Sequence, residues 1–272
     1  MSDLQIHQQI LDLQNKIFSL KISLVKAIEE REYLLRTVKP SIEANYQLKI
    51  GVFQIELTQI EVEARRLKKM IHKIQADINQ DRKPDIVKIE KELEKEFQKW
   101  YRQIKNEAEK IEKAQNRFNN QMTDSQSAEF KKLFRELVKK LHPDINSNLS
   151  EAEKEVWLKV LHAYNHGDLE ELRALSVLME SSNDGEQIPK EKNELQSQVD
   201  SLTIHLKRTE EEITTIQNAH PFDLIDPLDD KSWVENKQSE ILDHISQWKQ
   251  MIMTYADIIE KLLGFKINTL LD

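Results

Sequence analysis

Apolar residues recur at alternating spacings of four and three along most of the chain, with charged and polar residues between them. This spacing is the heptad pattern of helices that pack through a narrow apolar seam. Four stretches follow it, namely Ile6 to Leu34, Tyr46 to Ile78, Leu195 to Ile216 and Ile241 to Leu262. The pattern predicts four long helices.

The prolines indicate where these helices end. Pro40 lies between the first two stretches, Pro84 precedes a further N-terminal helix, and Pro221 and Pro227 lie between the last two stretches. Proline lacks a backbone N–H and disfavours helix in the residue before it. We therefore expect antiparallel hairpins, the first of them turning at Pro40. The predicted fold class is all-α, with antiparallel coiled-coil hairpins flanking a central helical hairpin.

The first helix of that central hairpin has one apolar face and one basic face. Its apolar stripe consists of Phe130, Leu133, Phe134, Leu137, Val138 and Leu141. The basic residues fall mostly outside this stripe, and they are Lys131, Lys132, Arg135, Lys139 and Lys140. Because Pro143 follows, the helix should stop at about Leu141, and His142-Pro143-Asp144 should form an exposed turn.

The second helix of the central hairpin has its own start and stop signals. Ser150 and Glu153 form a capping box that begins it, and Gly167 supplies its C-terminal stop. Its apolar stripe contains Val156, Trp157, Val160, Ala163 and Tyr164. The two stripes are expected to bury each other, which would leave the turn between the helices in solvent.

These residues resemble the J-domain of DnaJ-type co-chaperones. The helix II pattern of that family is an apolar residue, two basic residues, an aromatic followed by Arg, and then His-Pro-Asp. Similar residues stand here at Phe130, Lys131, Lys132, Phe134, Arg135, His142, Pro143 and Asp144. The family's helix III is similar to Trp157, Val160, Ala163 and Tyr164. The register therefore agrees across both helices.

The resemblance implies a partner and a set of binding residues. It implies that His142, Pro143 and Asp144 touch a DnaK-type chaperone, while Lys131, Lys132, Arg135, Lys139 and Lys140 meet an acidic surface on it. Exposed charges on a rigid helix orient a transient partner without much buried area. The leading expectation is a non-enzymatic J-domain-like co-chaperone or adaptor, whose coiled coils bind a client or complex that the sequence does not identify.

A second hypothesis is a structural subunit of a larger bacterial assembly that keeps the J-like hairpin only as a packing unit. Three departures from the family pattern favour it. Ile145 stands where a Lys or Arg is usual, Glu136 interrupts the basic face, and the start of the family's helix I is missing upstream of Asp124. For the His142-Pro143-Asp144 tripeptide itself, the alternative interpretation is a plain turn between two helices, which needs a proline and a capping aspartate.

The domains are expected to follow one another along the sequence. Residues 1–122 should form an N-terminal coiled-coil arm plus a third helix, and residues 123–180 the J-like module. Residues 181–190, which contain Ser181-Ser182-Asn183-Asp184-Gly185, should be a linker. Residues 191–272 should form the C-terminal antiparallel hairpin. The heptad seams also leave a homodimer open.

Composition narrows the function classes. The chain has no cysteine, which excludes disulfides and thiolate chemistry, and its net charge of -8 argues against general nucleic-acid binding. Nucleic-acid binding by the basic helix remains a third and weaker hypothesis for the function. We expect neither a catalytic site nor a cofactor or metal, since no phosphate loop or catalytic motif is present and His162 and His166 lack a third ligand. Without a long apolar run, we expect no membrane segment and a cytoplasmic location.

Overall fold

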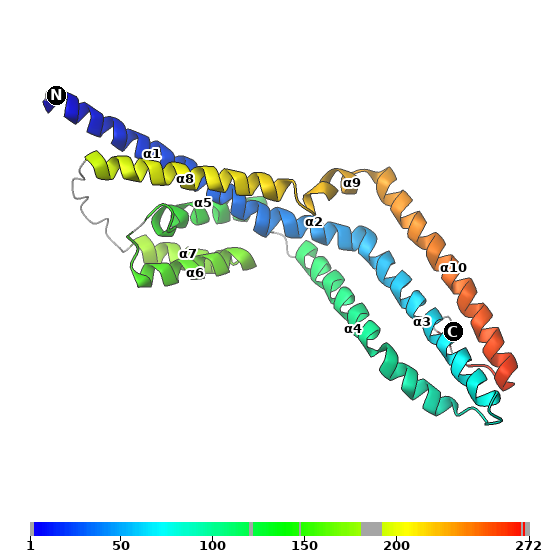
Figure 1. The fold of residues 1–272 in the computed structure, drawn as a ribbon. Coiled ribbons are helices and arrows are strands. Elements are labelled where there is room, and N and C mark those ends of the chain that lie inside the picture. The colour runs from blue at the N-terminus through cyan, green and yellow to red at the C-terminus, as the bar shows by residue number, and fades with distance from the viewer. Residues whose placement is uncertain (1–2, 120–121, 147, 181–191, 268, 270–272) are drawn as a thin grey trace. The chain divides into compact units, whose positions relative to one another are not determined.

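The computed structural model describes residues 3–119, 122–146, 148–180, 192–267 and 269. All of its regular elements in these ranges are helical, so the predicted all-α fold class is confirmed (Figure 1). The chain divides into two compact units, each made of two separate segments. The first unit comprises residues 1–41 and 121–223, and the second comprises residues 42–120 and 224–272.

The first unit is built around two long helices that run in the same direction. These are α1 (Asp3–Tyr33) and α8 (Lys192–Gln217). Near their N-termini Lys192 Nζ donates to Gln9 Oε1 at 2.7 Å, and near the other end Arg31 Nη1 lies 2.8 Å from Glu212 Oε2. The apolar seam predicted for each helix is therefore used, but the partner helix is distant in sequence.

Three shorter helices pack in the same unit, and their limits follow from local signals. Helix α5 (Asp124–Leu141) begins with a capping box at Thr123, α6 (Glu151–His166) with the predicted box at Ser150, and α7 (Leu169–Glu180) follows. Gly167 ends α6 in the left-handed conformation at φ 66°, which is why glycine suits that position. The predicted end of α5 at Leu141 is confirmed.

The second unit contains a helical hairpin and a third long helix. Helices α3 (Val52–Ile78) and α4 (Ile86–Asn119) are antiparallel, joined by ion pairs from Lys69 to Glu96 and from Lys73 to Glu92. Helix α10 (Lys231–Leu263) packs on α3 through an aliphatic core that includes Ile252 and Leu67. The short elements η3 (Phe222–Leu224) and α9 (Ile225–Asp229) precede α10.

The predicted hairpin turn at Pro40 is wrong, because the chain stays helical there. Two π turns, η1 (Leu34–Val38) and η2 (Gln47–Gly51), flank α2 (Lys39–Tyr46), which contains Pro40. In η1 the backbone N–H of Lys39 donates to Leu34 O, one residue further back than in an α-helix. This wider turn lets a proline follow without the clash it causes inside a regular α-helix.

The predicted order of domains also needs correction. Helix α1 does not pair with α3, and α8 and α10 do not form the C-terminal hairpin. Instead, α8 packs on α1, and α10 packs on α3. A heptad seam specifies that a partner exists without specifying which seam it is. The expected linker at residues 181–190 lies outside the described residues.

Candidate functional site

The two central helices meet through a cluster of aromatic rings. The ring centroids of Phe134 and Tyr164 are 3.8 Å apart, and those of Phe130 and Tyr164 are 4.9 Å apart. Trp157 extends the cluster toward the turn, 6.1 Å from Phe134 and 5.1 Å from His142 in an edge-on contact. The predicted mutual burial of the two apolar stripes is therefore confirmed, and the turn begins at the edge of this aromatic core.

His142 is a core residue rather than an exposed one. It follows α5 in an extended conformation, as expected before a proline, and only 7% of its surface is exposed. The backbone N–H of Asp144 donates to His142 Nδ1 at 3.1 Å. Burial lowers the pKa of the imidazole to about 4, because a charged ring is poorly solvated beside Trp157. At neutral pH His142 is therefore uncharged.

Asp144 is held by helix α8. Arg208 Nη2 donates to Asp144 Oδ2 at 3.0 Å, and His205 Nδ1 lies 3.1 Å from Oδ1 of the same carboxylate. Only 19% of the Asp144 side chain is exposed. Arg208 also approaches Glu212, which pairs with Arg31 of α1. The carboxylate is thus one member of an ionic network that joins the turn to the α1/α8 pair.

The expectation of a fully exposed turn is therefore wrong for two of its three residues. Pro143 is exposed, as predicted, but His142 is buried and both Asp144 oxygens face α8. The reason is tertiary, since the residues that cover the turn follow it by about 60 positions in the sequence. The local pattern around Pro143 contains no information about that contact.

Three of the five basic residues assigned to partner binding have partners within the chain. Arg135 forms two hydrogen bonds with Glu29 of α1, at 2.6 and 2.7 Å, which raises the pKa of its guanidinium. Lys131 Nζ lies 4.0 Å from the centre of the Tyr33 ring, and Lys140 Nζ donates to the Met179 carbonyl at 3.2 Å.

Lys132 and Lys139 are exposed. Arg135 and Lys140 are exposed as well, but their charged groups contact the Glu29 carboxylate and the Met179 carbonyl. The surface available to a partner is consequently smaller and less basic than the helix II pattern alone predicts.

Sequence reasoning missed the two α8 residues that complete this site. His205 and Arg208 are three residues apart, and Glu212 follows at a further spacing of four, so the three lie on one side of α8 beside its buried seam. That polar stripe was the available signal. It indicates a charged contact along the helix, but not that Asp144 provides the opposite charge.

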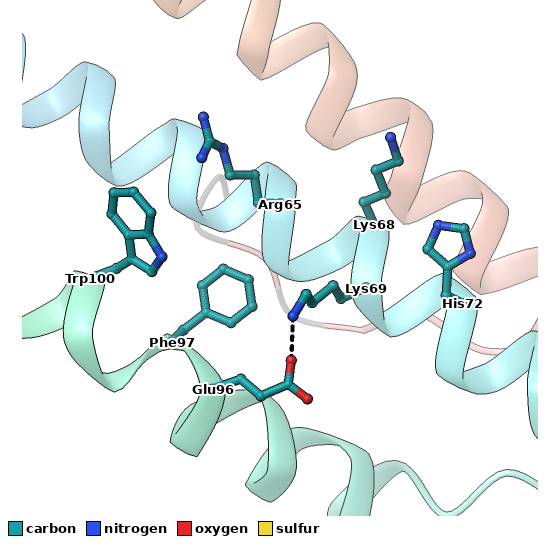
Figure 2. Close-up of a pocket in the computed structure, with 7 residues that line it drawn as sticks. All are labelled: Arg65, Lys68, Lys69, His72, Glu96, Phe97 and Trp100. Atoms are coloured by element: carbon teal, nitrogen blue, oxygen red, sulfur yellow. Dashed lines mark hydrogen bonds and ion pairs between the residues drawn. The ribbon is translucent and has the colours of Figure 1, made fainter.

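A second candidate feature is a hollow in the second unit, between α3 and α4 (Figure 2). It has a volume of about 420 Å³ and is lined by Arg65, Lys68, Lys69, His72, Glu96, Phe97 and Trp100. Hydrogen bonds from Lys69 and then Lys73 lower the pKa of Glu96, and the Arg65 guanidinium lies 5.6 Å from the Trp100 ring centre. Exposed ion pairs of this kind are typical of two packed surface helices, so these contacts account for the hollow as part of the α3/α4 packing.

Neither feature has the ligands of a metal centre. Within the described ranges, no group of three His, Asp or Glu side chains converges as a metal site needs. The helices described also include none with the length and apolar character required to cross a bilayer. No protein-family model matches this sequence, and no curated protein or solved structure matches it either.

Proposed function

We propose that the protein is a non-enzymatic helical scaffold or adaptor of a larger assembly, in which the J-like hairpin serves as a packing unit. The observation that supports this function best is the occupied turn, with Asp144 paired to Arg208, with His205 beside the same carboxylate, and with His142 buried against Trp157. A partner that reads the tripeptide must first displace these contacts. Removing Arg208 would leave the mostly covered Asp144 carboxylate without its cation, and the 54% exposure of Arg208 reduces the cost of doing so.

The arrangement of long seams supports the same proposal. In each unit the apolar seams of the long helices pack against other helices of the same unit. Long packed helices are rigid, so they can present binding surfaces along their length at fixed spacing. Pull-down of the tagged full-length chain from its native cell is the direct test. Stoichiometric recovery of a large protein that is not a chaperone supports the scaffold. ATP-dependent recovery of a DnaK-type chaperone as the main partner contradicts it.

A second candidate function is the co-chaperone that the resemblance implies. It is favoured by Lys132 and Lys139 of α5 and by Pro143 of the turn, which remain exposed. In that function the chain raises ATP hydrolysis by a DnaK-type chaperone. The relevant assay is chaperone ATPase with the wild-type chain, with His142→Gln and with Arg208→Glu.

The wild type and the two variants together distinguish the co-chaperone function from the scaffold function. Stimulation by the wild type that His142→Gln abolishes supports the co-chaperone. Stimulation only by Arg208→Glu shows that the contact with Asp144 keeps the turn from its partner. No stimulation by any of the three, with all of them folded by circular dichroism, leaves the scaffold as the supported function.

A further inference from the structure

The N-terminal half of α1 presents an apolar face that no described element covers. Leu11, Phe18 and Ile22 are exposed by 44%, 68% and 39% of their surfaces. At 3.6 residues per turn, they precede Glu29 by about five, three and two turns, so the four residues lie on one side of the helix. An exposed phenylalanine in the middle of such a stripe is unusual for a helix that is otherwise amphipathic.

The same face is covered further along the helix. At Glu29 helix α5 lies against α1, and Arg135 of α5 binds the Glu29 carboxylate, whose side chain is only 13% exposed. Helix α5 ends at Leu141. The apolar face of α1 thus continues beyond its contact with α5 with none of the described helices on it, although α8 still covers the opposite seam as far as Gln9.

We propose that a second copy of this chain occupies this face, with the two α1 helices antiparallel between His7 and Ile22. Pairing this stretch with itself places Leu11 of one copy beside Phe18 of the other, and each copy supplies the helix that the other lacks. The contact is isologous, so one two-fold axis closes it as a dimer. It extends the interface that α5 already makes and does not depend on the function proposed above.

Charge favours a second copy over a charged partner. From His7 to Ile22 the only residues with a formal charge are Asp12, Lys16 and Lys21, in a chain where 32% of residues are charged. Two copies therefore meet with little repulsion. In the antiparallel pairing, Asp12 of one copy and Lys16 of the second copy fall at nearly the same level on the same flank, and opposite charges there favour this register.

The test is the mass of the full-length chain by light scattering over a hundredfold range of concentration. We expect dimer for the wild type, and at least a tenfold weaker association for Phe18→Lys. The matched control is Ile204→Lys on α8, which is 67% exposed and lies outside the stripe. It should associate like the wild type. Circular dichroism checks that both variants fold.

The absence of cysteine allows a second, more specific measurement. Leu11→Cys and Phe18→Cys chains, mixed and oxidised, should give a disulfide between the two variants faster than either variant gives with itself. A wild type that stays monomeric throughout overturns the proposal. So does a dimer that Phe18→Lys leaves intact, one that Ile204→Lys disrupts equally, or crosslinking with no preference for the mixed pair.

Discussion

Ion pairs join neighbouring helices in both compact units, but the two sets differ in burial. In the α3/α4 hairpin, Lys69 and Glu96 are both well exposed, and Phe97 provides the apolar contact beneath them. At the turn after α5, the ion-paired carboxylate of Asp144 is mostly covered and adjoins the buried His142. Arg208 is 54% exposed and Lys69 is 55% exposed, so the difference between the two pairs comes from the carboxylate. Loss of the ion pair should therefore cost little at Glu96 and more at the covered Asp144.

The largest effect is expected in the aromatic core that supports the turn. Phe134 is fully buried and stacks on Tyr164, so Phe134→Ala should lower the free energy of opening of α5 and α6 by about 3–5 kcal/mol. Hydrogen exchange of amides in these two helices measures it. Ile204→Ala on α8, at a position that is 67% exposed and lies outside the α1 stripe, is the control and should change the same amides by less than about 0.5 kcal/mol.

The pH dependence of the first unit should come next in size. The folded pKa of His142 is about 4 against an ordinary value of 6.5, so the unfolded chain binds more protons between these values. Stability from this group is fully present above pH 6.5 and is lost as the pH falls to about 4, by roughly 3 kcal/mol.

The groups that face this imidazole are Asp144, Arg31, His205 and Arg208. Hydrogen exchange of α5 amides at pH values from 7 to 4, corrected for the intrinsic rate, should follow this slope. His142→Gln removes the titrating ring and should flatten the profile. An equally steep profile in that variant would assign the effect to other groups.

A smaller loss is expected when the turn is released from α8. Asp144→Asn removes the charge that Arg208 and His205 approach, and it should destabilise the turn by about 1–2 kcal/mol at pH 7. Protection of amides near the C-terminus of α5 and in the middle of α8 should fall together. Loss of protection in α5 alone would show that α8 does not hold the turn.

The smallest effect is expected in the exposed ladder of the second unit. Glu96→Gln removes the partner of Lys69 and should cost about 0.2–1 kcal/mol, less at high salt. Thermal unfolding in 50 mM and in 500 mM NaCl provides the measurement. If Glu96→Gln costs as much as Asp144→Asn at both salt concentrations, the contrast in burial does not explain the energetics.

Much of the local structure was predictable because its signals are local. The ends of α5 and α6, the capping box at Ser150 and the stop at Gly167 each depend on residues within one helical turn. The exposure of the turn was not predictable in this way. Nothing near Pro143 indicates that Arg208 covers Asp144, and a polar stripe on α8 fits solvent as well as it fits a partly covered carboxylate.

The sequence by itself determined an all-α chain, the position of most helices and the aromatic pairing of α5 with α6, because periodicity, caps and short connections act over a few residues. Only the tertiary structure decided which long helix pairs with which, that the chain stays helical through Pro40, and that His142 is uncharged and enclosed. Heptad seams are interchangeable as surfaces, so their pairing depends on the energy of the whole fold. The chemistry of the turn depends on that choice.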